Sequence, residues 1–288
     1  MFESDILSNR RRWQVTRLSR RVRHRLRIGW RRLLSSRRAL PDFIIIGAQK
    51  SGTSSLYARL AAHPQVLGAS WKEVHFFDRH FSSGTRWYRA HFPRLRRMER
   101  SKTVTGEATP AYLYHPRAAE RIAEVVPSVK LVALLRHPVD RAISHYWHEV
   151  ERGREHLPLE EALAAEGERL RADEARKDDD LAFGYNHRHY AYTRRGLYAE
   201  QLKRYDRYFE GDQLLVLKSE DFFSDVQATF DRVARHLGLA PHALPRAEPR
   251  NTGSYPEAPP AVRQRLEAFF RPHNRALYDF VGVSEPWW

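Results

Sequence analysis

The stretch from Phe43 to Leu56, FIIIGAQKSGTSSL, limits the possible folds more than any other part of the sequence. An isoleucine run typical of a buried strand meets a turn rich in glycine, serine and threonine, and an apolar helical pattern begins at Leu56. A strand, a glycine-rich turn and a helix N-terminus direct several backbone N–H groups at one point. The stretch therefore predicts a site for a phosphate-like anion, with an ordinary strand-to-helix turn as the alternative.

The lysine of this turn stands on the other side of the glycine from the lysine of a nucleoside triphosphate loop. Such loops read G-x-x-x-x-G-K-[ST], whereas here Lys50 comes two residues before Gly52. Lys50 adds a full positive charge, and Ser51, Thr53 and Ser54 add hydroxyl donors. The chemistry favours an anion, and the spacing disfavours a nucleoside triphosphatase.

A second predicted strand ends in another anion-binding group. The apolar run 129–135 leads into Arg136, and Ser144 follows eight residues later on a predicted helix. An arginine fork and a nearby hydroxyl can share a phosphate. Taken alone, Arg136 could equally pair with Asp140 or Glu149, but two such strand ends in one sheet favour a ligand with phosphates at both ends.

The order of the predicted elements indicates an α/β protein. Predicted strands are 43–47, 65–67, 129–135 and 213–217, and predicted helices are 53–62, 117–126, 139–152, 159–176, 197–209, 225–237 and 261–280. Apolar strands alternating with helices predict a P-loop-like three-layer fold, in which helices flank a central, mainly parallel sheet. Ligands of such sheets bind at the carboxyl ends of the strands.

The net charge of +15 is concentrated at the N-terminus. Residues 1–41 hold thirteen arginines against Glu3 and Asp5, a net +11, which separates a basic arm from a domain at 42–288. Within the arm an apolar stripe recurs every three or four residues: Leu18, Val22, Leu26, Trp30 and Leu33. This pattern predicts an amphipathic helix on an anionic membrane surface, with a solvated basic extension as the alternative. Nucleic-acid binding is disfavoured because no recognition motif accompanies the charge.

The composition indicates in which cellular compartment the protein is expected. The chain has no cysteine, so thiolate metal sites and disulfides are excluded. It also lacks a run of eighteen apolar residues and a signal-peptide pattern. We therefore expect a cytoplasmic protein that is membrane-peripheral if the arm binds lipid.

Several motifs together resemble one enzyme family. GAQKSGTSSL resembles the 5′-phosphosulfate loop of sulfotransferases that use 3′-phosphoadenosine 5′-phosphosulfate (PAPS), and LLRHPVDRAISHYWH resembles their 3′-phosphate motif. Four further stretches resemble the heparan sulfate glucosaminyl (N-/3-O-) sulfotransferases, with this chain as a bacterial member: KEVHFFD, GEATPAYL, RGLYAEQLKRY and FFRPHNRALYDFVG. The matches run in order through nearly all of 43–288.

The resemblance implies a donor site and a catalytic group. It assigns the 5′-phosphosulfate to Lys50, Ser51, Gly52, Thr53 and Ser54, the 3′-phosphate to Arg136 and Ser144, and the nucleotide end to Arg250, Asn251, Thr252 and Gly253. It makes Glu73 the base, with Lys50 stabilising the leaving group and His75 and Asp78 orienting the base or the acceptor. No metal is required. At Glu73 the alternative is a surface ion pair with Lys72, and at 250–254 it is a plain connection.

The acceptor implied by the resemblance is a hydroxyl or amine of a saccharide or glycolipid. Six basic residues between the motifs are candidates for lining an acidic-sugar cleft or forming a solvated face: Arg152, Arg154, His187, Arg188, His189 and Arg194. The rival functions are a P-loop kinase or nucleoside triphosphatase and a non-catalytic binder of nucleic acid or membrane. The former lacks a lysine after Gly52 and an acid at the end of strand 129–135.

Overall fold

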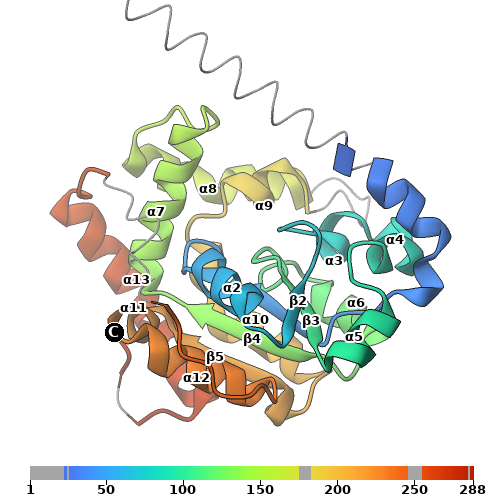
Figure 1. Cartoon of the computed structure of the whole chain (residues 1–288). Coiled ribbons are helices and arrows are strands. Elements are labelled where there is room, and N and C mark those ends of the chain that lie inside the picture. The colour runs from blue at the N-terminus through green and yellow to red at the C-terminus, as the bar shows by residue number, and fades with distance from the viewer. Residues whose placement is uncertain (1–22, 25, 175–182, 246–254, 285) are drawn as a thin grey trace, which may run out of the picture.

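The centre of the protein is a five-stranded parallel sheet (Figure 1). The computed structural model describes residues 23–24, 26–174, 183–245, 255–284 and 286–288. The strands are β1 (Phe43–Gly47), β2 (Val66–Gly68), β3 (Val104–Ala108), β4 (Lys130–Leu135) and β5 (Leu214–Lys218). Their order is β2-β3-β1-β4-β5, and every neighbouring pair is parallel. The carboxyl ends of β1, β3 and β4 therefore meet at one edge.

Side chains alternate between the two faces of the sheet, as pleated strands require. In β1, Ile44 and Ile46 join the core on one face, and Phe43 and Ile45 join the core on the other. All five residues of β1 are buried. Burial on both faces explains why this strand reads as an unbroken apolar run.

Helices cover both faces and form a three-layer structure (Figure 1). The first face packs against α3 (Phe76–Arg79), α6 (Ala118–Val125) and α10 (Tyr198–Asp206). The second face packs against α2 (Thr53–Ala62), α11 (Ser219–Ser224) and α12 (Val226–His236). A third apolar cluster joins α7 (Pro138–Glu151), α8 (Leu159–Glu174) and α13 (Pro260–Val281).

Short helices complete the described chain. They are α4 (Thr85–Arg89), α5 (Leu95–Ser101), α9 (Tyr185–His189) and the 3₁₀ helices η1 (Ser35–Arg37), η2 (Phe81–Ser83), η3 (Arg194–Gly196) and η4 (Gly211–Gln213). The described part of the predicted arm is helical up to residue 33 and packs on the body. Ile28 and Ala39 are buried, and the amide of Ala39 donates to the carbonyl oxygen of Pro93.

The predicted α/β class and parallel sheet are confirmed, but one central strand is missing from the prediction. β3, with the sequence VTGEA, has no apolar run. Gly106 lies against Phe43, and a Cβ at this glycine would stand 2.5 Å from the aromatic ring. Because the strand needs a small residue there and also carries a buried acid, its sequence does not show the usual strand signal. The short helices α3, α4, α5, α9 and α11 were likewise not predicted.

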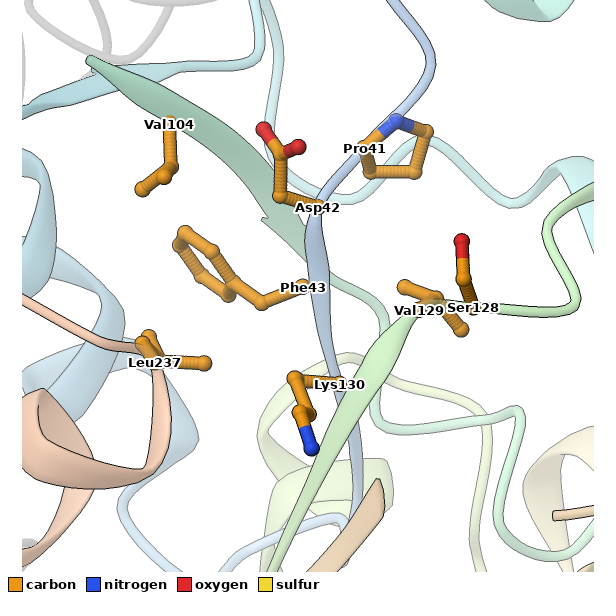
Figure 2. A pocket seen from close by; sticks show the side chains of 8 residues that line it. All are labelled: Pro41, Asp42, Phe43, Val104, Ser128, Val129, Lys130 and Leu237. Atoms are coloured by element: carbon orange, nitrogen blue, oxygen red, sulfur yellow. The ribbon is translucent and has the colours of Figure 1, made fainter. Parts of the chain in front are cut away.

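The amino ends of the strands border a hollow of about 280 Å³ (Figure 2). It is lined by Pro41, Asp42, Phe43, Val104, Ser128, Val129, Lys130 and Leu237. Both charged groups already have protein partners: Asp42 Oδ2 accepts from the Thr105 amide at 2.7 Å, and Lys130 Nζ lies 2.7 Å from Asp212 Oδ2. The predicted anion-binding residues follow the opposite, carboxyl ends.

Candidate active site

The turn between β1 and α2 leaves several backbone N–H groups available for a ligand. α2 begins at Thr53, and Gly52 before it has φ +90°. Across the part of the chain that the structure describes, no protein acceptor takes the amides of Gly52, Thr53 and Ser54. With the positive end of the helix dipole behind them, these amides are placed as the predicted anion site requires.

Glycine at position 52 has two physical reasons. Its φ lies in the left-handed region that glycine tolerates best. An added Cβ would also stand 2.7 Å from Cζ of Phe223. The turn is further anchored by Ser219, whose hydroxyl donates to the carbonyl oxygen of Ser51 at 2.8 Å.

The two predicted anion-binding strand ends adjoin each other. Arg136, directly after β4, donates from Nη1 to the carbonyl oxygen of Lys50 at 3.3 Å. Tyr198 fixes the backbone there by donating to the Arg136 carbonyl at 2.8 Å. Burial lowers the pKa of Lys50, with Arg136 and Arg152 lowering it further and Glu151 opposing them. A half-buried cation beside a second cation is a site that an anion would stabilise.

The surface pairing considered for Arg136 does not occur. Asp140 lies 2.6 Å from Nη2 of Arg263, and Glu149 pairs with Arg154 and His189. Ser144 lies on α7 with 4% of its surface exposed. Arg136 therefore remains available to a ligand. Ser144 is carried by α7, the helix that follows Arg136.

Glu73, His75 and Asp78 form a row linked by hydrogen bonds. Nε2 of His75 lies 3.1 Å from Glu73 Oε2, and its Nδ1 lies 2.9 Å from Asp78 Oδ2. Burial opposes protonation of His75, but the bonds to Asp78 and Glu73 outweigh it and raise its pKa to about 9. The imidazole is therefore protonated near neutral pH and donates to both carboxylates.

The same contacts keep Glu73 ionised. Burial acts to raise its pKa, yet His75 and Lys72 hold the pKa below its ordinary value. The rings of Phe76 and Phe77, which follow this stretch, are fully buried in the core on one face of the sheet. Trp71 keeps 37% of its surface exposed.

Lys72 connects Glu73 to the loop 48–52 and the start of α2, together called the donor loop below. Its Nζ lies 3.0 Å from Ser54 Oγ at the start of α2 and 3.4 Å from Glu73 Oε1. The ion pair considered as the alternative for Glu73 therefore exists, but it is part of the site. The sequence shows no signal for this role, because the contact spans eighteen positions between the first turn of α2 and a later loop.

The backbone of the Glu73 loop is held by two hydroxyl groups from the segment after β3. The amides of Val74 and His75 donate to Thr109 Oγ1 at 3.2 and 3.4 Å, and the Phe76 amide donates to the Tyr112 hydroxyl at 2.8 Å. His75 has φ +56°, a left-handed conformation that costs a non-glycine residue of order 1 kcal/mol. The three consecutive bonds offset that cost.

Both hydroxyls are in turn oriented by one buried carboxyl group. Thr109 Oγ1 donates to Glu107 Oε2 at 2.6 Å, and Tyr112 donates to Glu107 Oε1 at 3.1 Å. Tyr88 donates to the same Oε1 at 2.7 Å. Burial raises the pKa of Glu107, and the hydroxyl bonds act against that rise. Because each hydroxyl donates its proton to Glu107, its oxygen lone pairs are left to accept from the amides of the Glu73 loop.

The six basic residues considered for the acceptor divide into two groups. Arg154 and His189 hold the buried Glu149, and His187 lies 3.0 Å from the Tyr114 hydroxyl, so these three have structural contacts. Arg152 adds positive charge near Lys50, and Arg188 lies near Arg79 and Asp78. Arg194 is exposed.

Some of the predicted residues lie outside the described part of the chain. Arg250, Asn251, Thr252 and Gly253 lie outside the described residues, as do Leu18 and Val22. Among the described residues there is no group of three or more His, Cys, Asp or Glu side chains placed to hold a metal ion. No helix within the described ranges is long and apolar enough to cross a membrane.

A parallel sheet with lysine and arginine after two adjacent strands, next to an ionised carboxylate, is the arrangement expected of a group-transfer enzyme with an anionic donor. The family described as the sulfotransferase domain matches residues 40–249, and the chain belongs to this family. It is a sulfotransferase.

Individual relatives agree. Heparan sulfate glucosamine 3-O-sulfotransferase 6 of Mus musculus is 33% identical over 275 residues, covering 87% of this chain and 75% of that protein. The membrane-associated sulfotransferase kil1 of Dictyostelium discoideum is 25% identical, covering 86% and 66%. The crystal structure of a sulfotransferase from Alicyclobacillus acidocaldarius superposes with a TM-score of 0.65 at 32% identity, covering 86% of this chain and 98% of that one.

Proposed function

We propose that this sulfotransferase moves the sulfuryl group of PAPS to a hydroxyl of a saccharide by in-line displacement, with Glu73 as the base. The observation that carries the proposal is the position of Lys72, whose ammonium group contacts both Ser54 of the donor loop and Glu73. A carboxylate held this close to the donor loop can take a proton from an acceptor that attacks there. The acceptor would then attack, and the bisphosphate would leave, in adjoining parts of one site.

The residues present fit such a donor. Free amides at the start of α2, the Lys50 ammonium and the Arg136 guanidinium offer two clusters of donors for anionic groups at either end of a nucleotide. PAPS supplies the sulfuryl group and leaves as adenosine 3′,5′-bisphosphate. Lys50 would stabilise the negative charge that develops on the leaving oxygen. Arg136 and Ser144 would hold the 3′-phosphate.

Glu73 would take the acceptor proton on a carboxylate oxygen. His75 and Lys72 lower its pKa, so the group is ionised and ready to accept across the neutral range. A lowered pKa weakens a base. We infer that the acceptor displaces water around Glu73 when it binds, and that this desolvation restores basicity. His75 and Asp78 keep the carboxylate pointed at the acceptor.

The saccharide acceptor is supported by the relatives whose names specify heparan sulfate glucosamine. Arg188 and Arg79, close to Asp78, add positive charge on the acceptor side. This charge suits an acidic sugar, either free or carried on a glycolipid. A hydroxyl is favoured over an amine, because the 3-O-sulfotransferases named among the relatives act on hydroxyl groups.

The test is transfer of radiolabelled sulfate from PAPS to heparan sulfate, to its N-desulfated form and to glycolipid extracts. Label in a saccharide product, abolished by Glu73→Gln, supports the proposal. If the wild-type protein labels no saccharide or glycolipid while still binding the donor product, the acceptor assignment is wrong. If Glu73→Gln retains full transfer, the base is another residue.

A further inference from the structure

The helix formed by the described residues up to 33 carries an apolar stripe on the side turned away from the protein. Leu26, Trp30 and Leu33 keep 65%, 77% and 76% of their surfaces exposed. The body-facing positions are those of Ile28, which is 5% exposed, and Arg31, which donates to the Phe92 carbonyl at 2.9 Å. At about 100° per residue, these two sets of positions lie on opposite sides of the helix.

This orientation is the reverse of a helix that packs its apolar face on its own core. Leu34, at 44% exposed, widens the stripe. Three large apolar side chains on the helix, and Leu34 directly after it, are therefore open to solvent, while Ile28 and Arg31 face the body. Such an arrangement indicates that the apolar face has a partner outside this chain.

The body extends the same surface. Arg38 forms an isolated antiparallel bridge with Arg94, which places the start of α5 beside the end of the arm. There Leu95 is 39% exposed, and Arg96 and Arg97 are exposed as well. Figure 1 shows the arm helix lying along α4 at this side of the molecule. Two segments far apart in sequence thus contribute exposed leucines and arginines to one face.

The positive charge of this face indicates what kind of partner it binds. The described residues between 23 and 41 include no acid and four exposed arginines, Arg23, Arg27, Arg32 and Arg37, and the segment 94–100 adds four arginines against Glu99. A second copy of the chain would bring like charges together. An anionic lipid surface instead neutralises the arginines and accepts the apolar side chains at the depth of the acyl boundary.

We propose that the arm helix and the start of α5 form one membrane-binding face that docks on anionic lipid, with Leu26, Trp30 and Leu33 inserted and the arginines at the headgroups. This face adjoins the candidate site. The ring of His24 lies 4.8 Å from that of Trp71, and Trp71 directly precedes Lys72. Docking through the arm would therefore hold the Glu73 loop near the lipid surface.

The experiment measures co-sedimentation of the full chain with phosphatidylcholine vesicles that contain or lack phosphatidylserine. The expected result is binding that requires phosphatidylserine, weakens with salt, and is lost in Leu26→Ser/Trp30→Ser/Leu33→Ser. The matched control is Tyr208→Ser/Phe269→Ser, which removes exposed aromatic side chains elsewhere and should leave binding unchanged.

The contribution of the body is measured separately. Replacing Arg94, Arg96 and Arg97 by serine should weaken partitioning onto the anionic vesicles by about fivefold for each arginine. The control is Arg271→Ser/Arg275→Ser on α13, on the other side of the molecule from the arm (Figure 1). All variants should keep donor-induced stabilisation, so a failure of this proposal is distinct from a failure of the donor site.

Three results overturn the proposal. One is binding to anionic vesicles that the apolar triple variant retains, because the face would then be a general polyanion surface. Another is unchanged partitioning without Arg94, Arg96 and Arg97, which would restrict the contact to the arm. The third is concentration-dependent dimerisation that the triple variant abolishes in the absence of lipid, which would make a second copy the occupant.

Discussion

Nε2 of His75 lies 3.1 Å from Oε2 of Glu73. The imidazole, protonated because Asp78 holds its other nitrogen, donates to the carboxylate that we assign as the base. This pairing fixes the direction of Glu73 and lowers its pKa. It also makes the activity depend on the protonation of two neighbouring groups.

Replacing Glu73 by glutamine should separate chemistry from donor binding. The amide keeps the size of the side chain but cannot accept the proton, so we expect kcat to fall by about 10²–10⁴. Donor binding, measured by calorimetry with adenosine 3′,5′-bisphosphate, should change little. Lys50→Ala is the contrasting variant and should lose both binding and turnover. Equal loss of binding in the two variants would contradict the separation.

The pairing of His75 predicts an alkaline loss of stability. Its pKa in the folded protein, about 9, lies above the ordinary 6.5. The stabilising contribution is fully present below pH 6.5 and is lost as the pH rises through 9, by roughly 3 kcal/mol at most. Urea unfolding between pH 6 and 10 measures this loss, and His75→Asn should flatten it. An identical pH dependence in the variant would show that another group titrates.

Removing the positive charge of Lys72 should shift the acid limb of the kcat profile. Lys72 helps to lower the pKa of Glu73, so Lys72→Met should raise that pKa and move the limb to higher pH. Lys130→Met is the matched control, since Lys130 also pairs with a carboxylate, but at the amino end of the sheet. A limb that stays in place in Lys72→Met would mean that Glu73 does not titrate in this profile.

Glu107 is expected to act on catalysis through the backbone of the Glu73 loop. A glutamine there cannot accept from all three hydroxyls, so one of them must turn, at a cost of about 1–3 kcal/mol. Glu107→Gln should lower kcat and melting temperature, leave donor affinity unchanged, and move the pKa of His75, read by NMR titration, towards 6.5.

The control for Glu107 is another buried carboxyl group with a similar environment. Glu166 accepts from the Thr193 hydroxyl and from the amides of Thr193 and Arg194. Glu166→Gln should lose comparable stability while kcat and the pKa of His75 stay as in the wild type. If both variants lose kcat alike, Glu107 has a general structural role and does not position the loop.

The proximity of Lys50 and Arg136 could be predicted from the sequence, because Arg136 directly follows one apolar strand of a parallel sheet and Lys50 comes three residues after another. Periodicity and turn signals were sufficient for this part of the fold. Glu73 and His75 lie in an irregular stretch and Asp78 in the short helix α3, and only the resemblance pointed to them. The structure adds that their side chains touch.

Other features could not be predicted, for identifiable physical reasons. Glu107 lies in a strand without an apolar run, and an acid in such a sequence looks exposed until tertiary packing surrounds it with hydroxyl groups. Lys72, in a loop, meets Ser54, in the first turn of α2, and the relative position of these two segments depends on the sheet order. The periodicity of Leu26, Trp30 and Leu33 predicted one apolar face, but not that this face turns away from the body.

The most direct test of the account is ligand-induced thermal stabilisation by adenosine 3′,5′-bisphosphate, compared with ATP and Mg²⁺, GTP and 5′-AMP. At about a hundred times its dissociation constant, a ligand adds roughly 2.7 kcal/mol. We predict selective stabilisation by the bisphosphate that Arg136→Ala removes. A preference for ATP with Mg²⁺, or an equal response to all four nucleotides, would contradict the assignment of Lys50 and Arg136 to the two ends of the donor.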